Sequence, residues 1–114
     1  MKKSKKLKSG YKDDADKVRF NSIPPVELME IANLYTMGGN KYEDGNYLKG
    51  MKYSRVYSAL FRHLLKWLWG ERYDKDDGQS HLSSVAWCAI TLLYYENNRD
   101  KYSGFDDRMF IKES

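Results

Sequence analysis

The sequence predicts a small all-α domain, built as a bundle of helices. Its 114 residues leave room for one domain and little more. Apolar residues recur at helical spacing along two long stretches, residues 54–69 and 80–96, and along a shorter stretch that begins at Pro25. The single cysteine, Cys88, excludes an intramolecular disulfide and a multi-cysteine zinc site. We therefore expect packed helices without a covalent framework.

The first 17 residues predict a flexible basic arm. Six of the 20 lysines and arginines lie in residues 1–12, which leaves 14 basic against 16 acidic residues in the rest of the chain. The folded part is therefore nearly neutral, and the formal net charge of +4 comes from the arm. Such an arm can contact nucleic acid through nonspecific electrostatics, but we favour a solvated arm without that role.

No segment of the sequence predicts export or membrane insertion. The basic N-terminus is not followed by an apolar stretch, so it lacks the form of a signal peptide. No run approaches the roughly 20 apolar residues of a transmembrane helix. We expect a cytoplasmic protein without membrane contact.

The first predicted helix follows an extended lead-in at residues 19–25. The pair Pro24-Pro25 disfavours helical backbone in the residue before it and suits the first turn of a helix. Helical spacing follows in Leu28, Met29, Ile31, Ala32 and Tyr35. The sequence Gly38-Gly39-Asn40 predicts the end of this helix, and residues 41–52 then read as a polar loop.

The second predicted helix begins at Ser54, a good N-cap, and ends near Trp69. Most of its circumference is apolar, with one continuous face and residues that widen it: Val56, Ala59, Leu60, His63, Leu64 and Trp67, then Tyr57, Phe61, Leu65 and Leu68. Its polar line is Arg55, Ser58, Arg62 and Lys66. Such a helix belongs at the centre of a bundle or in a subunit interface.

The last long helix is predicted from the N-cap Ser80 to Glu96. Two stripes run along it. The apolar stripe, which we expect to be buried, is Leu82, Val85, Ala86, Ala89 and Leu92 or Leu93. The polar stripe, which we expect to face solvent or a site, is His81, Ser84, Cys88, Thr91 and Tyr95. The domain would span residues 18–98, followed by a tail at residues 99–114 held by its aromatic residues Tyr102, Phe105 and Phe110.

The join between the two long helices holds the residues most suited to chemistry. Both histidines of the chain, His63 and His81, flank an acidic loop that contains Glu71, Asp74, Asp76 and Asp77. In an antiparallel hairpin these groups gather at one end, and carboxylates crowded together repel one another unless a cation joins them. Oxygen ligands suit Mg²⁺ or Mn²⁺, and Mg²⁺ commonly completes its shell with water and substrate phosphates.

Simpler interpretations of the same residues stay open. The acidic loop can be solvated charge that favours a helix N-terminus. His63 can be a hydrogen-bonded core residue, and His81 a surface residue. Arg55, Arg62 and Lys66 can form a solvent face, although guanidinium groups there can also clamp phosphates.

An ordered series of short motifs runs from residue 17 to residue 96. They are Lys17-Val18-Arg19-Phe20, Ile23-Pro24-Pro25, Gly39-Asn40-Lys41-Tyr42, Gly45-Asn46-Tyr47, Arg62-His63-Leu64-Leu65-Lys66-Trp67, Gly70-Glu71 with Asp74, Gly78, and His81-Leu82. Together they resemble the dATP/dGTP diphosphohydrolase N-terminal family, small and mostly phage-encoded relatives of the MazG-like all-α NTP pyrophosphohydrolases. Each motif alone is weak, and their order is fairly specific.

The resemblance implies a helical bundle of the all-α NTP pyrophosphohydrolase type, assembled as a homodimer or higher homo-oligomer. It implies Mg²⁺- or Mn²⁺-dependent hydrolysis of a nucleoside triphosphate, with a purine dNTP as the expected substrate, to dNMP and pyrophosphate. By motif position, the expected metal ligands are Glu71 and Asp74, to which we add Asp77 of the same acidic loop. The expected catalytic groups are Glu71, Asp74, His63 and His81. The expected substrate contacts are Arg19, Lys41, Tyr42, Asn46, Arg62 and Lys66.

The chain also departs from the family pattern. Ser84 and Cys88 stand where a histidine and an asparagine are usual, and Tyr47 stands where tryptophan is commoner. Both of the first two departures fall on the polar stripe. They favour the alternative to an enzyme, a non-catalytic helical module that binds nucleotide or nucleic acid.

Overall fold

The computed structural model describes residues 7–110, and every regular element within that range is helical. The long helices are α1 (Pro25–Lys41), α2 (Tyr53–Leu68) and α3 (His81–Asn97), followed by the short α4 (Arg99–Tyr102). Three 3-10 turns accompany them: η1 (Phe20–Ser22), η2 (Asn46–Lys49) and η3 (Ser103–Phe105). The predicted all-α class is confirmed. The lysines of the predicted arm at positions 2, 3, 5 and 6, and residues 111–114 of the predicted tail, lie outside the described residues.

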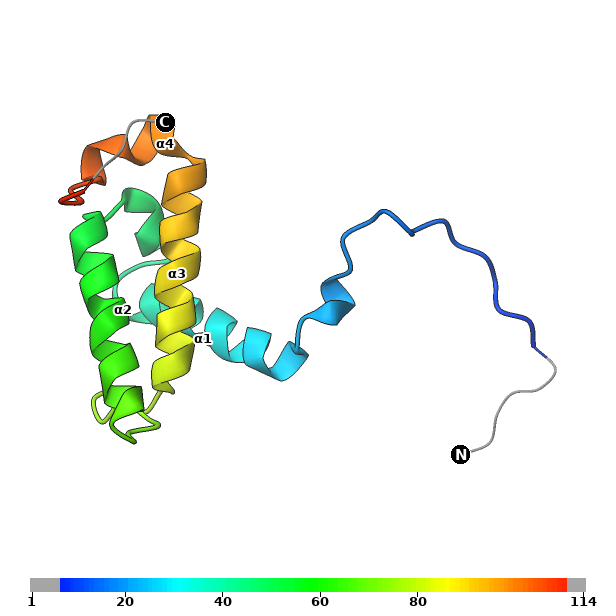
Figure 1. Cartoon of the computed structure of the whole chain (residues 1–114), viewed down its shortest axis with the longest axis horizontal. Helices are drawn as coiled ribbons and strands as arrows, with labels where there is room; N and C mark the ends of the chain where they lie inside the picture. Colours follow the sequence, from blue (N-terminus) through cyan, green and yellow to red (C-terminus); the bar gives the residue numbers. More distant parts are fainter. Residues whose placement is uncertain (1–6, 111–114) are drawn as a thin grey trace.

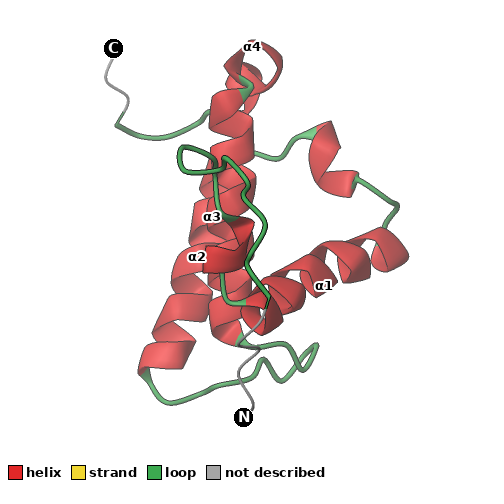
Figure 2. Ribbon diagram, turned by 90° about the vertical axis from the view of Figure 1, so that its right-hand side faces the viewer, coloured by secondary structure: helices red, strands yellow, loops and turns green. Residues whose placement is uncertain are grey.

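Helices α2 and α3 form an antiparallel hairpin, and α1 crosses it against α3 (Figures 1 and 2). The part of the chain that precedes α1 extends away from this body, and its described residues 7–24 are exposed (Figure 1). None of the helices described here is both long and apolar enough to cross a bilayer. The hairpin therefore brings the end of α2 and the start of α3 together.

The buried side of α3 is the polar stripe, and the expectation that the apolar stripe would be buried is wrong for this chain. All five members of the polar stripe are buried, whereas Leu82 and Leu93 of the apolar stripe are 46% and 54% exposed. Polar groups tolerate burial when they find hydrogen-bond partners. Thr91 finds one in α1, because its hydroxyl lies 2.8 Å from that of Tyr35.

Tyrosines join the helices to the loop that precedes α2. The hydroxyls of Tyr95 and Tyr102 donate to the backbone carbonyls of Tyr47 and Leu48, each at 2.6 Å. The ring of Tyr95 also stacks on that of Tyr53, with centroids 5.8 Å apart. A tyrosine buries a large ring and supplies a donor at its tip. The tyrosine hydroxyls therefore hold η2 against α3.

Two of the predicted helix ends differ from the structure. Helix α1 does not stop at Gly38 but continues to Lys41. A Cβ at Gly39 would lie 2.5 Å from Oδ1 of Asp44, so this glycine permits a close approach of the following loop. Helix α2 begins at Tyr53, with Lys52 at the N-cap position and no side-chain cap. Ser54 lies inside the first turn and donates its amide and hydroxyl to the carboxylate of Asp107.

The predicted cap of α3 is confirmed. Ser80 accepts a hydrogen bond from the amide of Ser83 at 3.0 Å, as a serine N-cap does. In the C-terminal segment, Tyr102 is buried and Phe105 is half-buried, as expected of residues that hold it to the core. Phe110 is instead exposed.

The apolar circumference of α2 is only partly covered. Tyr53 and Val56 are buried, whereas four large apolar side chains are exposed: Phe61, Leu65, Trp67 and Leu68. In the single chain α2 is therefore not the centre of a bundle. The sequence predicted that this helix lies either at the centre of a bundle or in a subunit interface. The exposed apolar side chains are compatible with the second position.

Candidate functional site

Two histidines and one aspartate meet at the end of the α2–α3 hairpin. His63 lies in the second half of α2, His81 is the first residue of α3, and Asp74 lies in the turn between them. The two Nδ1 atoms are 2.9 Å apart, and Nδ1 of His63 is 3.8 Å from Oδ2 of Asp74. One ligand atom from each of the three residues lies within 4.8 Å of the others. We call this group the hairpin cluster.

The backbone of the turn places Asp74. An isolated antiparallel bridge joins Tyr73 to Ser80, and the amide of Asp74 donates to the carbonyl of Gln79 at 2.7 Å. Oδ1 of Asp74 accepts the amide of Asp76 at 2.9 Å, which leaves Oδ2 on the side of His63. That hydrogen bond is the main cause of a lowered pKa for Asp74, and the positive charge of Lys66 adds to it. Asp74 is therefore a carboxylate at neutral pH.

The imidazoles are held in a mostly dry environment. Burial is the main cause of a lowered pKa for His63, and the neighbouring His81 lowers it further, so His63 is neutral at pH 7. His81 is fully buried, at 0% exposure. Its Nε2 has no hydrogen-bond partner and lies 3.6 Å from Oε1 of Glu71. A buried ring nitrogen without a hydrogen-bond partner is costly unless another group uses it.

The other expected acidic residues surround the hairpin cluster without joining it. Glu71 is half-buried beside His81, on the far side from His63. Asp77 is exposed, and its Oδ1 accepts the amide of Gln79 at 2.9 Å. Of the three expected metal ligands, Asp74 lies within the cluster, Glu71 adjoins it and Asp77 does not belong to it.

The expected phosphate contacts are divided between two places. Lys66 is half-buried on α2, close enough for its charge to lower the pKa values of His63 and Asp74. Arg62 is exposed on the same helix and donates to Oγ of Ser58 at 3.1 Å. Arg19 is exposed in the segment before α1. The structure therefore brings Lys66 near the cluster and leaves Arg19 outside the helical body.

Two of the expected substrate contacts, Tyr42 and Asn46, line a small aromatic cavity of about 230 Å³. Its walls are Leu34, Tyr35, Gly38, Gly39, Tyr42, Gly45, Asn46, Tyr47, Met51 and Trp87. The amine of Lys41 lies over the ring of Tyr42, 5.3 Å from its centroid, at the edge of this cavity. A second cavity of about 180 Å³ is lined by His63 and Ser84 and shares Leu34 and Trp87 with the first. The aromatic cavity therefore shares a wall with the cavity that His63 lines.

The match to known proteins covers almost the whole chain. A family model described as dATP/dGTP diphosphohydrolase, N-terminal, matches residues 8–108. The chain belongs to this family. A protein of Salmonella phage PMBT28 named dATP/dGTP diphosphohydrolase is 29% identical over 91 residues, which are 80% of this chain and 31% of that protein. The chain thus spans about a third of the length of that relative. No solved structure matches the chain.

Membership of the dATP/dGTP diphosphohydrolase N-terminal family confirms the resemblance found in the motifs. The matched range extends past residue 96, the end of those motifs, to residue 108. It therefore includes α4 and η3, whose Tyr102 donates to the carbonyl of Leu48. The segment that contacts the loop before α2 belongs to the same family unit as the hairpin.

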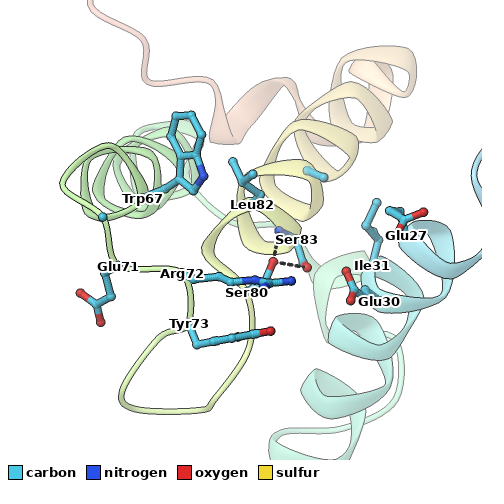
Figure 3. Close-up of a pocket in the computed structure, with 12 residues that line it drawn as sticks. Glu27, Glu30, Ile31, Trp67, Glu71, Arg72, Tyr73, Ser80, Leu82 and Ser83 are labelled. Atoms are coloured by element: carbon cyan, nitrogen blue, oxygen red, sulfur yellow. Dashed lines mark hydrogen bonds between the residues drawn. The ribbon is translucent and has the colours of Figure 1, made fainter.

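A groove of about 570 Å³ between α1, the start of α3 and the turn was not predicted from the sequence. Its polar lining includes Glu27 and Glu30 on α1 and Glu71 and Arg72 in the turn. Figure 3 shows Arg72 extending past Ser80 toward α1, while Glu71 points to the other side of the turn. The three-residue spacing of Glu27 and Glu30 was the available signal, because it places both carboxylates on one helix face.

Proposed function

We propose that this chain hydrolyses a deoxynucleoside triphosphate to a monophosphate and pyrophosphate, with a divalent metal ion at the hairpin cluster. The observation that carries this proposal is the convergence of His63, Asp74 and His81 beside a cavity lined by the family's loop motif. Family membership supports a nucleotide as the substrate. The proposal includes a purine preference, for which the name of the phage relative is the support.

The aromatic cavity is suited to a nucleobase. Tyr42, Tyr47 and Trp87 offer ring faces for stacking, and the amide of Asn46 can hydrogen-bond to a base edge. The rings of Tyr35 and Trp87 are already in contact, with centroids 5.4 Å apart. A base in this cavity would leave its phosphates near the wall shared with the cavity of His63.

The residues of the hairpin end would then act on the triphosphate. A divalent ion bound there would neutralise phosphate charge and polarise the phosphoryl group. Lys66 would contact phosphate oxygens, joined by Arg62 after its bond to Ser58 is released. Water attacks the α-phosphorus, pyrophosphate leaves, and the proton lost by the water passes to a carboxylate at this end of the hairpin.

Pyrophosphate release from the four dNTPs and ATP, each with Mg²⁺ or Mn²⁺, tests this function. We expect turnover in the wild type and its loss in Glu71→Gln and Asp74→Asn. Asp76→Asn is the matched control, because Asp76 lies in the same turn with an exposed side chain and contacts Asp74 through its backbone. Equal losses in Asp76→Asn and Asp74→Asn, or no turnover of any nucleotide by the wild type, would contradict the proposal.

A second function is a binding module without catalysis. Two features favour it: the basic arm, and the cavity beside His63, which is lined by Ser84 and Cys88, the two departures from the family pattern. This module would bind dNTPs without releasing pyrophosphate. If its ligand is DNA, affinity should fall with salt and on deletion of residues 1–12.

We also propose that a second copy of the chain covers the apolar stripe of α3 and the exposed apolar side of α2. Both surfaces run along helices of 16 and 17 residues, which are about 24 Å long. Two such hairpins can pair about a twofold axis as a four-helix bundle. A small domain that leaves Leu65, Leu68 and Leu93 exposed gains from this burial.

A further inference from the structure

We infer that the hairpin cluster binds a first-row transition-metal ion, such as Mn²⁺, Fe²⁺, Co²⁺ or Zn²⁺, in preference to Mg²⁺, and that Glu71 positions His81 for this ion. The inference rests on the proposed function for the role of the site and on the described side chains for its metal preference. Of the three oxygen ligands expected from the sequence, Glu71, Asp74 and Asp77, it keeps only Asp74. The imidazoles of His63 and His81 take the places of the other two.

The types of donor atom favour a transition metal. Imidazole nitrogen suits zinc, iron, copper and nickel, whereas Mg²⁺ takes oxygen ligands almost exclusively. The hairpin cluster offers two imidazoles and the carboxylate of Asp74. Two of the three groups therefore disfavour Mg²⁺, and all three are compatible with the transition metals.

The spacing of the donors fits one ion. Bonds of about 2.1 Å place neighbouring ligands about 3.0 Å apart around an octahedral ion and about 3.4 Å apart around a tetrahedral one. The Nδ1 atoms of His63 and His81 are 2.9 Å apart, and the distance from His63 to Oδ2 of Asp74 is 3.8 Å. The first separation matches the octahedral spacing, whereas His63 and Asp74 must approach one another to bind one ion. The third pair, His81 and Asp74, lies within 4.8 Å, so the three groups converge on one place.

The tautomer of His81 follows from its surroundings. A hydrogen on Nδ1 would leave a lone pair on the buried Nε2, facing the carboxylate of Glu71 at 3.6 Å. A hydrogen on Nε2 instead faces that carboxylate and can donate to it after a small approach. The second arrangement avoids repulsion between lone pairs. It also lets Nδ1 of His81 accept the hydrogen bond between the two rings from Nδ1 of His63, a bond that an ion between the rings would replace.

Glu71 is therefore a positioning residue and not a ligand. A carboxylate that accepts the second ring N–H of a metal-bound histidine fixes its tautomer and orientation, and its loss commonly weakens metal binding by about 10- to 100-fold. Here Glu71 faces Nε2 of His81, and Nδ1 of the same ring faces His63 in the hairpin cluster, which is the arrangement of such a carboxylate–histidine pair. Asp77 has no comparable place, because its carboxylate accepts a backbone amide at the exposed side of the turn.

One side of the cluster is open to a substrate. His81 and Asp74 are buried, at 0% and 8% exposure, whereas the side chain of His63 is 21% exposed and lines the cavity that contains Ser84. An ion held by three side chains keeps at least one position for water or phosphate. The open side faces the wall that is shared with the aromatic cavity.

Metal binding without nucleotide tests the inference. The full chain, freed of metal by a chelator, is titrated with Co²⁺ followed by its visible absorption, and with Zn²⁺, Mn²⁺ and Mg²⁺ by calorimetry. We expect one equivalent of transition metal per chain, bound at least about tenfold tighter than Mg²⁺. Asp77→Asn should leave the affinities unchanged. His63→Gln and His81→Gln should abolish the Co²⁺ spectrum, and partly exposed His63 keeps the test valid if the His81 variant does not fold.

The positioning role of Glu71 has its own measurement. Nitrogen chemical shifts of His81 in the metal-free protein should report hydrogen on Nε2 in the wild type and a mixture of tautomers in Glu71→Gln. The same variant should bind Co²⁺ about 10- to 100-fold more weakly, with unchanged circular dichroism. An unchanged tautomer and affinity in Glu71→Gln would show that Glu71 does not position His81.

The failures of this inference and of the proposed function are distinguishable. Mg²⁺ binding as tightly as Co²⁺, or Co²⁺ binding that survives both histidine substitutions, overturns the metal inference whether or not pyrophosphate is released. Specific Co²⁺ binding without turnover of any nucleotide leaves the metal inference standing and overturns the hydrolase function.

Discussion

Gly50→Ala should destabilise the fold by about 2–6 kcal/mol. Gly50 has φ +94° and ψ 147°, a combination that side chains rarely adopt, and such strain costs about 1–3 kcal/mol. An added Cβ would also overlap the ring of Phe105, 2.6 Å from Cζ and 2.8 Å from Cδ2. Displacing a packed ring costs about another 1–3 kcal/mol. The total is a large part of the roughly 5–15 kcal/mol that stabilises a typical domain.

Alanine substitutions at two other glycines distinguish the cost of backbone strain from the cost of steric overlap. Gly70 has a similar φ of +97°, but a methyl group added there would meet open space, so Gly70→Ala should cost the strain alone, about 1–3 kcal/mol. Gly38 lies within α1, also with open space, and Gly38→Ala should stabilise the protein by about 0.5–1 kcal/mol. Urea unfolding followed by circular dichroism gives all three values, provided that the free energy of unfolding depends on urea concentration with the same slope in every variant.

The overlap has an internal control. Phe105→Leu in the Gly50→Ala background should recover part of the loss, because it removes the ring atoms that the methyl group meets. The reasoning is refuted if Gly50→Ala costs no more than Gly70→Ala. In that case Phe105 does not pack on Gly50 in solution, and the contact between η3 and the loop before α2 is lost with it.

Three further predictions address the core and the exposed face. Tyr95→Phe should cost about 1–2 kcal/mol in urea unfolding, because the carbonyl of Tyr47 loses its donor. Burial raises the pKa of Cys88 to about 11 from 9.0, so its thiol should react with a disulfide reagent at pH 8 far more slowly in the folded than in the unfolded protein. The pKa of this thiol is higher in the folded than in the unfolded protein, so the protonated thiol contributes about 2–3 kcal/mol to the free energy of unfolding below pH 9. This contribution is lost as the pH rises to 11. Comparing the unfolding of wild type and Cys88→Ala across that pH range should show the difference. Leu65→Glu and Leu93→Glu should each convert a dimer to a monomer in analytical ultracentrifugation, and a wild type that sediments as a monomer contradicts the proposed pairing.

Local sequence pattern was sufficient for the helices and insufficient for their orientation. The spacing of apolar residues and the Ser80 cap located α2 and α3 to within one or two residues. The buried side of α3 was misassigned because its polar groups are satisfied by distant partners, such as Tyr35 for Thr91, 56 residues away. A hydrophobicity pattern indicates which residues are apolar, but it does not indicate which polar groups distant in the sequence will form hydrogen bonds with one another.

The hairpin cluster was predictable in outline for a topological reason. An antiparallel hairpin must bring the end of one helix to the start of the next, so His63, Asp74 and His81 were expected to gather. The choice among neighbouring carboxylates was not predictable, because the hydrogen bonds of the turn decide it. Each of Asp74 and Asp77 accepts the amide two residues further on, but Asp74 lies beside the Tyr73–Ser80 bridge, where its own amide bonds to Gln79 and its side chain is buried, whereas Asp77 stays exposed.

The buried polar stripe of α3 also explains how one short chain can hold two parts of a ligand site. His81 at the start of the stripe belongs to the hairpin cluster, and Tyr95 near its end holds the loop that lines the aromatic cavity. Trp87, a wall of that cavity, follows His81 by six residues, about 9 Å along the helix axis. That distance is short enough for one nucleotide to reach both places. Both places lie within the packed helices and their turn, so the separation between the proposed metal and base positions does not depend on the segment before α1.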